Sequence, residues 1–341
     1  ITIEDTMSQS PLVFTPIEAS TAGENYVAFR QKNAGGGMPL YINGMEYDAK
    51  KDDGFMPVMP GELISVIARP GHWKTGMKLR WARERAKDLQ RQAAAGNETA
   101  AKSVVVYVTL EQKVEELRLF QVAAENKISM SEVASGKIQD WSKVTNGLRR
   151  LYSSPLWFVG RSMDRRKQKA QMTDGNVYTA LEEIEKWQDD NQTQIIDSVF
   201  IDYLQKFRPS GDFVEYYSGL MNTLAGWAGD FMTRMVVGVQ AKREVDRRDV
   251  QIPMMDDGQW SSTIEQFSDG VLSLVRPCLY PKKEFDGVAI SGSQQLLVSC
   301  LKRKLGPANF NRWTHIDPKY NILSEAEIKE YNFRVASGKD E

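Results

Sequence analysis

The residues best suited to chemistry lie in one short segment between an apolar run and a helical pattern. Residues 62–68 are rich in isoleucine and valine and predict a buried strand, and a helix is expected from about Lys74 to Arg91. Between them a Pro-Gly turn leads into adjacent lysine and threonine residues, Lys74 and Thr75. At such a helix N-terminus the backbone N–H groups bind phosphate oxygens, a lysine adds a mobile positive charge, and a threonine hydroxyl suits Mg²⁺. The segment therefore predicts a site for ATP and Mg²⁺, with nucleotide-binding residues Arg69, Pro70, Gly71, His72, Trp73, Lys74 and Thr75.

This segment departs at two positions from the usual phosphate-loop pattern, Gly-x-x-x-x-Gly-Lys-Ser/Thr. Ala68 stands in place of the first glycine, and Trp73 stands in place of the second. Because a glycine before the lysine lets the backbone approach phosphate closely, a tryptophan there would strain the loop or cover the nucleotide. The alternative is an ordinary strand–turn–helix in which Lys74 is a solvated residue of the first helical turn.

Three more polar residues come directly after apolar, strand-like runs: Glu111, Asp202 and Gln240. Glu111 could orient and deprotonate an attacking water, Asp202 could hold the magnesium shell opposite Thr75, and Gln240 could sense the γ-phosphate. The alternatives are a helix cap for Glu111 and ordinary strand-end polar residues for the other two. The Lys74-Thr75 segment and these three residues each follow a predicted strand. This arrangement favours a nucleotide site, because ligands of parallel sheets bind beyond the carboxyl ends of the strands.

The remaining elements would position these residues in an α/β fold. Apolar strands that alternate with helices predict a mostly parallel, twisted sheet with helices on both faces. Further strands are expected at residues 103–109, 156–159, 195–201, 235–239, 270–275 and 296–301, and helices at about 114–126, 176–190 and 214–233. Residues 1–59 show weak periodicity and predict an irregular N-terminal arm or linker with a small hairpin at Asn43-Gly44. Residues 60–323 would form the ATPase domain, and residues 324–341 a C-terminal helix or tail.

Composition narrows the class of protein. The chain has 341 residues, of which 41% are hydrophobic and 26% charged, enough to bury a substantial core. Its two cysteines cannot build a disulfide framework or a four-ligand metal site by themselves. No long apolar stretch predicts a membrane span and no signal peptide is evident, so a cytoplasmic protein is expected. With a net charge of −1, nucleic acid would bind to a local strip or a ring lumen, not over the whole surface.

Several segments resemble the ATPase domain of the DnaB-type replicative helicases, a branch of the RecA fold. The resemblance runs from about Pro60 to Leu323 and is closest at Ile201-Asp202-Tyr203-Leu204-Gln205, which is similar to the family's metal-binding strand. Other similar segments are Thr109-Leu110-Glu111, whose counterpart carries the family's catalytic base, Gln240 with Arg243, Thr263-Ile264-Glu265-Gln266 with Asp269, and Lys302-Arg303-Lys304-Leu305-Gly306-Pro307. The resemblance implies a RecA-like P-loop core.

The resemblance also implies an assembly and partners. Protomers would form a ring, as a hexamer, with ATP between neighbours and with Lys302 and Lys304 reaching into the adjacent site. Lys304 stands where the family has an arginine finger, and lysine lacks the planar fork of arginine. The loops after the fourth and fifth strands would bind single-stranded DNA through Lys206, Arg208, Lys242, Arg243 and Arg247. Replication or loader proteins would be further partners. The alternative for these loops is a pair of solvated basic surfaces.

Two other functions remain open from the sequence. Trp73 and Lys304 are compatible with a catalytically weak ATPase that acts as an oligomeric adaptor or loader. A filament-forming replication or recombination protein of the same fold is the second alternative.

Overall fold

The computed structural model describes most of the chain in two separate units, residues 1–38 and 39–341. The described residues are 16–32, 37–40, 54–55, 57–164, 172–189, 192–209, 213–258, 261–282, 284–285, 288–290, 294–317, 319–320 and 322–323. The predicted hairpin at Asn43-Gly44 and the predicted tail at 324–341 lie outside these residues. The predicted domain boundaries at residues 59 and 323 therefore stay predictions.

The first unit contains a helix that the sequence analysis did not predict. Helix α2 spans Pro16–Lys32, and every one of its side chains that the structure describes is exposed. Its apolar residues are scattered around the helix and form no stripe, so the periodicity that normally reveals a surface helix is missing.

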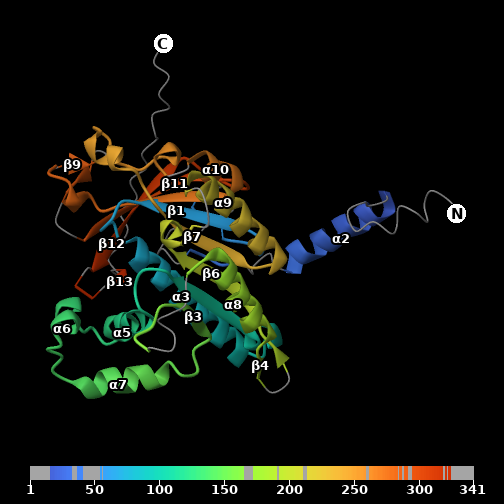
Figure 1. The fold of residues 1–341 in the computed structure, drawn as a ribbon, viewed down its shortest axis with the longest axis horizontal. Coiled ribbons are helices and arrows are strands. Elements are labelled where there is room, and N and C mark those ends of the chain that lie inside the picture. Colours follow the sequence, from blue (N-terminus) through green and yellow to red (C-terminus); the bar gives the residue numbers. More distant parts are fainter. Residues whose placement is uncertain are drawn as a thin grey trace, which may run out of the picture. The chain divides into compact units, whose positions relative to one another are not determined.

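The centre of the second unit is a mixed sheet (Figure 1). Within the described part of the chain, its nine strands are β1 (Leu63–Ala68), β2 (Ser103–Thr109), β3 (Leu156–Gly160), β6 (Ile195–Asp202), β7 (Arg234–Gln240), β8 (Gly270–Val275), β11 (Gln295–Arg303), β12 (Phe310–Asp317) and β13 (Ile322–Leu323). Their order is β13-β12-β11-β8-β1-β7-β6-β2-β3. The strands from β8 to β3 run parallel, and β11, β12 and β13 are antiparallel. The mostly parallel sheet predicted from the sequence is confirmed.

Helices cover both faces of this sheet (Figure 1). The helices of this unit in the described residues are α3 (Lys74–Ala94), α4 (Glu98–Ala101), α5 (Val114–Glu125), α6 (Met130–Ser135), α7 (Trp141–Arg150), α8 (Asp174–Lys186), α9 (Phe213–Asp230) and α10 (Ser261–Phe267). Helices α6 and α7 pack on α5 and do not cover the sheet themselves. The 3₁₀ turns are η1 (Leu204–Lys206), η2 (Arg243–Arg247), η3 (Met255–Asp257) and η4 (Pro277–Leu279). Two small ribbons pair β4 (Gln188–Asp189) with β5 (Gln192–Thr193), and β9 (Glu284–Phe285) with β10 (Val288–Ala289).

Alternation along the strands decides which helix packs on which face. Leu63 and Ile67 of β1 belong to one buried cluster with residues of α8 and α9, such as Leu181 and Leu224. The buried residues of α3 are not part of that cluster, and α3 packs on the other face. Because successive strand residues point to opposite faces, strands buried on both sides read as continuous apolar runs, which is why the sequence revealed them.

The structure differs from the sequence analysis in several stretches, including α10 and β12, for which no element was predicted. The helix expected at 176–190 ends at Lys186, and Gln188–Asp189 forms strand β4 instead. Helices α6 and α7 lie in a stretch for which the sequence analysis predicted no element. Both begin at caps, since the Ser129 side chain accepts from the Glu132 N–H and the Asp140 side chain accepts from the Ser142 N–H.

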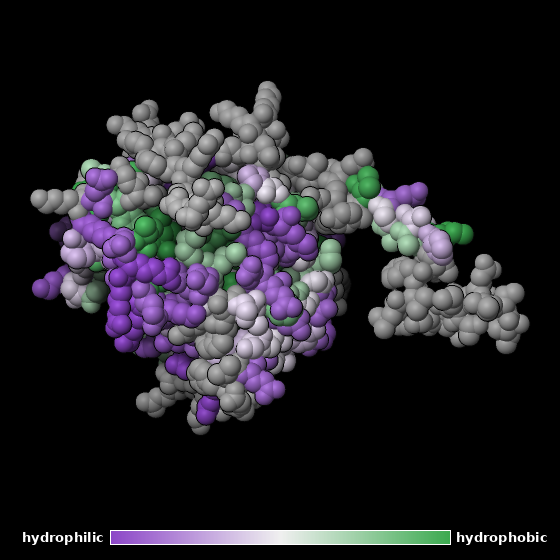
Figure 2. Space-filling view, turned by 90° about the horizontal axis from the view of Figure 1, so that it is seen from above, coloured by the Kyte–Doolittle hydropathy of each residue, from purple (hydrophilic) through white to green (hydrophobic). Residues whose placement is uncertain are grey.

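The visible face in Figure 2 is largely hydrophilic, with a smaller hydrophobic area. Within the described ranges, no helix combines the length and apolar character needed to cross a lipid bilayer.

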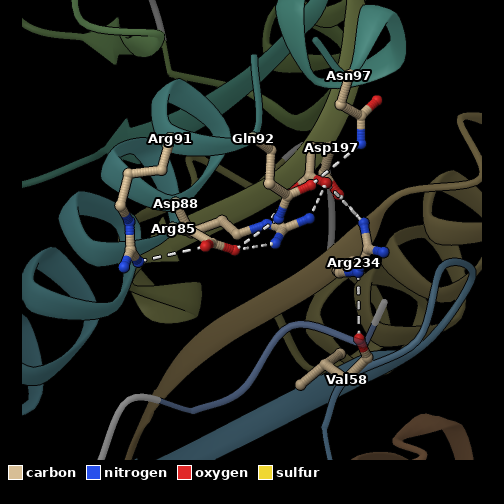
Figure 3. Close-up of polar contacts among 8 residues, drawn as sticks. All are labelled: Val58, Arg85, Asp88, Arg91, Gln92, Asn97, Asp197 and Arg234. Atoms are coloured by element: carbon tan, nitrogen blue, oxygen red, sulfur yellow. Dashed lines mark hydrogen bonds and ion pairs between the residues drawn. The ribbon is translucent and has the colours of Figure 1, made fainter. Parts of the chain in front are cut away.

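A buried ion network ties α3 to the two strands that carry Asp202 and Gln240 (Figure 3). Asp197 of β6 accepts from Arg85 of α3 at 2.6 and 2.8 Å and from Arg234 of β7 at 2.8 Å. Arg234 also donates to the Val58 carbonyl at 3.1 Å. Burial disfavours the charged form of Asp197, but the Arg85 hydrogen bond and the two guanidinium charges outweigh burial and lower the pKa of this carboxyl. The network fixes the helix behind the phosphate loop.

Replacing Asp197 by alanine is expected to cost about 3–5 kcal/mol in the free energy of unfolding, because the buried guanidiniums of Arg85 and Arg234 lose the buried carboxylate that they share. Urea unfolding measures the change. Since the folded pKa of Asp197 lies below its unfolded value of about 3.9, its stabilisation is complete above about pH 5 and is lost as pH falls through the folded pKa. The matched control is Asp88→Ala, which removes a carboxylate that also pairs with Arg85 but is 24% exposed, and its cost should stay near 1 kcal/mol. Equal costs for the two variants would contradict this role of Asp197.

Candidate functional site

The sheet register brings the predicted site residues to one edge. Ala68, at the end of β1, lies opposite Gln240 at the end of β7. Thr109, at the end of β2, lies opposite Asp202 at the end of β6. The four strands are neighbours in the order β1-β7-β6-β2, so the loops that follow them converge.

A cavity of about 800 Å³ opens at this edge. Of the residues predicted from the sequence, its lining includes Arg69, Pro70, Gly71, Trp73, Lys74, Thr75, Glu111 and Gln240. Apolar side chains from Leu79, Phe120 and Met130 line it as well. The cavity has the size and mixed lining of a small-molecule site, and it combines cationic and hydroxyl groups with an apolar wall. A nucleoside triphosphate matches this lining, since its phosphates suit the cationic and hydroxyl groups and its base suits the apolar wall.

The loop between β1 and α3 contains two residues with a positive φ, and one of them is the tryptophan before Lys74. Trp73 is the N-cap of α3 and lies in the left-handed region, with φ 65° and ψ 22°. Gly71 also has a positive φ of 82°. A left-handed conformation costs a bulky residue about 1–2 kcal/mol that a glycine would not incur. Trp73 therefore carries strain at a position where the backbone requires the conformation that glycine prefers.

Lys74 is buried at the base of the cavity, which excludes the solvated first-turn alternative. Its Nζ donates to the Val239 carbonyl at 3.3 Å and lies 4.3 Å from the centre of the Tyr203 ring. Burial lowers the pKa of Lys74 to about 7, and the neighbouring charge of Lys78 acts in the same direction. Phosphate oxygens in the cavity would give this ammonium a negatively charged partner and so favour its charged form.

Asp202 is buried, and both of its carboxylate oxygens accept hydrogen bonds. Its Oδ1 accepts from Lys78 Nζ at 2.5 Å, its Oδ2 accepts from the Tyr107 hydroxyl at 3.2 Å, and its carboxylate is hydrogen-bonded to the Thr75 side chain. Burial alone would raise the pKa of Asp202, but the charge and hydrogen bond of Lys78, the Thr75 hydrogen bond and the Lys74 charge together outweigh burial and lower the pKa. The carboxylate is therefore ionised at neutral pH.

The oxygen donors fit Mg²⁺. A threonine hydroxyl beside a carboxylate matches the hard ligands that this ion prefers, with waters and phosphates completing its shell. Within the described residues, no group of three histidine, cysteine, aspartate or glutamate side chains could hold a metal alone. Thr75 and Asp202 would thus hold Mg²⁺ together with the phosphates of a nucleotide.

Glu111 stands at the mouth of the cavity. Its carboxylate is half exposed and lies 3.3 Å from Lys206 Nζ. The following helix, α5, is capped by Glu116, whose carboxylate accepts from the Lys113 N–H, so Glu111 is not that cap. Gln240 lines the cavity, and its N–H donates to Gln205 Oε1 at 3.1 Å. A carboxylate and an amide thus face the space in front of Lys74.

Loops after β7 and β8 brace the phosphate loop. Arg69 pairs with Asp246 at 2.8 Å and donates to the Ala241 carbonyl at 3.0 Å. His72 Nδ1 accepts from the Arg276 N–H at 3.0 Å. Burial lowers the pKa of His72 to about 4, so the ring is neutral at pH 7 and can accept this bond. His72 was predicted to bind nucleotide; its side chain is buried and is not part of the cavity lining, and its bond to Arg276 positions the loop.

The remaining predicted residues do not line the cavity. Lys302 donates to the Glu265 carbonyl, and Lys304 is 71% exposed and lies 3.2 Å from Asp269. The predicted DNA-binding residues divide into two groups. Lys206 pairs with Glu111, and Lys242 donates to the Asp256 carbonyl at 3.0 Å. The other three, Arg208, Arg243 and Arg247, are exposed, and so is Lys206.

Sequence reasoning missed Lys78, Tyr107 and Asp246. Lys78 was detectable, because it follows Lys74 by four residues and so lies on the same face of α3. A lysine on the buried face of a helix calls for a charged partner. No local signal marks Tyr107 or Asp246, whose partners are distant in sequence.

Comparisons with known proteins show which proteins this chain is similar to. Among curated relatives, the replicative DNA helicase DnaB of Helicobacter pylori is 24% identical over 231 residues, 66% of this chain and 42% of the relative. That of Buchnera aphidicola is 23% identical over 280 residues, 77% of this chain and 54% of the relative. The chain thus spans about half the length of the curated relatives it matches.

Solved structures share the fold. The structure of a DnaB-like replicative helicase, described with its interactions with primase, has a TM-score of 0.63 at 19% identity and covers 79% of this chain and 60% of that one. A solved ATPase domain has a TM-score of 0.66 at 18% identity and covers 89% of this chain and 98% of that one. These similarities confirm the predicted RecA-like fold. The model of the DnaB-like helicase C-terminal domain matches residues 49–314, most of the chain. The chain therefore belongs to the DnaB-like helicase C-terminal domain family.

Proposed function

We propose that this chain is the motor domain of a DNA helicase, which hydrolyses ATP with Mg²⁺ and moves on single-stranded DNA. The observation that carries the proposal is the convergence of Lys74, Thr75, Glu111 and Gln240 at one cavity, with Asp202 beneath it. Membership of a helicase family favours this function over a catalytically weak adaptor.

Each residue would have a distinct role in hydrolysis. Lys74 would leave the Val239 carbonyl and bind the β- and γ-phosphates, because phosphate oxygens are far stronger partners for an ammonium. Glu111 would orient the attacking water and accept its proton. Gln240 would contact the γ-phosphate. Bound Mg²⁺, held by Thr75 and through water by Asp202, supplies positive charge against the phosphates.

We also propose that protomers assemble into a ring, as a hexamer, with the site completed by a neighbour. Lys302 and Lys304 lie outside their own chain's cavity, so they would act on the next one. The pairing of Lys304 with Asp269 is a surface contact worth about 0–1 kcal/mol, which leaves the lysine able to reach a phosphate. Replication or loader proteins are proposed as further partners.

Single-stranded DNA would bind to the loops after β6 and β7. Arg243 and Arg247 lie exposed on η2, in the loop whose Asp246 pairs with Arg69 of the phosphate loop. A nucleotide that moves Arg69 would therefore also move the proposed DNA-binding loop. Arg208 lies exposed after β6, while Lys206 and Lys242 would have to exchange their present partners for phosphates.

The double variant Arg243→Ala/Arg247→Ala is expected to weaken binding of fluorescein-labelled oligodeoxythymidylate. Loss of two phosphate contacts should reduce the slope of log affinity against log salt by roughly 1.4, at about 0.7 per contact. Fluorescence anisotropy over a salt series, with a non-hydrolysable ATP analogue present, measures this slope.

The matched control is Arg149→Ala/Arg150→Ala, which removes two exposed arginines from α7. It has the same change in net charge and should leave the slope unchanged. Equal slopes for the two variants would show that the proposed loop does not hold DNA. Absence of any binding by the wild-type protein at low salt would contradict the DNA-binding function itself.

A further inference from the structure

Lys78 is a buried cation directly behind the proposed magnesium site. It lies in the second turn of α3 and is fully buried, with 0% of its side chain exposed. Its Nζ donates to the Ile201 carbonyl at 2.8 Å and to Asp202 Oδ1 at 2.5 Å. Removing a lysine charge from water is costly, so it is tolerated where an opposite charge and further hydrogen-bond acceptors are fixed beside it. Asp202 and the end of β6 supply both.

The neighbouring strand leaves room for the Lys78 amine. Gly238 lies inside β7, and a Cβ at this position would overlap Lys78 Nζ. A glycine in a central strand weakens the strand, and it often marks a place where another group approaches the backbone closely. The pocket for the ammonium is therefore built from α3, β6 and β7 together.

The ion pair changes what Asp202 offers to a metal. Its carboxylate is held by Lys78 on Oδ1, by Tyr107 on Oδ2 and by the Thr75 side chain. The orientation of the carboxylate is thus fixed before any ligand arrives. The pair of Lys78 and Asp202 has no net charge, so the attraction of Asp202 for a divalent cation is largely cancelled. The protein alone should then hold Mg²⁺ weakly, and the phosphates must supply most of the attraction.

We propose that Lys78 is a positioning residue that fixes Asp202 beside Thr75 and offsets its charge, so that Mg²⁺ enters the site with the nucleotide and not before it. This inference rests on the proposed ATP site.

The test measures the Mg²⁺ concentration that half-saturates binding of a fluorescent, non-hydrolysable ATP analogue to the full chain. Lys78→Met leaves the charge of Asp202 uncompensated and is expected to lower this concentration by about tenfold or more, because a unit charge a few ångströms from a divalent ion is removed. The double variant Lys78→Met/Asp202→Asn also lacks the carboxylate that holds the ion, so it should require at least about tenfold more Mg²⁺ than Lys78→Met. Lys87→Met, an outward-facing change on the same helix, is the control and should match wild type.

A second comparison decides the matter even where Lys78→Met does not fold. Asp202→Asn leaves the Lys78 ammonium without its counter-charge, so it should require about tenfold more Mg²⁺ than the double variant. Equal Mg²⁺ requirements for Asp202→Asn and the double variant would overturn the role of Lys78 and leave the ATP site intact. Likewise, a Lys78→Met protein that folds and has an unchanged or raised requirement would show that Lys78 only stabilises the fold. A wild-type protein that bound no analogue at any Mg²⁺ concentration would instead overturn the proposed function, and this inference with it.

Discussion

Replacing Lys74 by methionine is expected to lower ATP turnover by at least about a hundredfold, since a charge preorganised against the transferring phosphate is lost. The ammonium is buried and already lies at the base of the cavity. Methionine fills a similar volume without the charge. Phosphate release under saturating Mg²⁺ and ATP measures the effect.

The same substitution should not unfold the protein. A buried charge costs free energy, so methionine at this position is expected to leave the thermal midpoint unchanged or to raise it. Lys87→Met on the same helix is the matched control, because Lys87 is 46% exposed and pairs with Glu84 and Glu125 at the surface. A Lys74→Met protein as active as this control would refute the phosphate-binding role.

Replacing Glu111 by glutamine should reduce turnover by about 10²–10⁴-fold and leave nucleotide binding intact. The amide keeps the shape of the side chain but cannot accept the proton of the attacking water. Because the pair with Lys206 is half exposed, its loss should change the free energy of unfolding by no more than about 1 kcal/mol. Phosphate release and titration with a fluorescent ATP analogue separate the two effects.

Glu98→Gln provides the control for Glu111, since Glu98 is an exposed carboxylate in the first turn of α4. Its turnover should equal that of wild type. A parallel loss of analogue binding in Glu111→Gln would mean that Glu111 positions the nucleotide and is not the base.

The sequence was most informative where several local signals agreed. The strands β1, β2, β6 and β7 are apolar on both faces, and each ends at a polar residue or a Pro-Gly turn. Both the strands and the order in which the candidate site residues follow them along the chain were therefore predictable. Helices α6 and α7 were missed although their caps at Ser129 and Asp140 are readable, because their short apolar patterns did not stand out.

The site was less predictable where contacts join distant segments. The Asp202 partner Tyr107 and the Arg69 partner Asp246 are far away in the sequence, and no local pattern pairs them. Trp73 in place of the usual glycine indicated a strained loop, but only the structure shows that the residue adopts the left-handed conformation. His72 is a residue type that often binds ligands and lies in the loop that would bind them, but its Nδ1 accepts a hydrogen bond from the Arg276 N–H.

The buried network of Arg85, Asp197 and Arg234 complements the site. It joins the C-terminal half of α3 to β6 and β7, while the N-terminus of α3 carries Lys74 and Thr75. Fixed at that end, the helix presents its first turn to Asp202 without rearrangement. Such preorganisation is what phosphoryl transfer requires, because positioning and charge supply most of its rate.

Steady-state phosphate release by the wild-type chain, with and without Mg²⁺ and with and without oligodeoxythymidylate, tests the central claim most directly. The proposed motor site predicts release that requires Mg²⁺ and that rises when single-stranded DNA is added. Release that is absent at high protein concentration under every condition, or that is the same for wild type and Glu111→Gln, would contradict it.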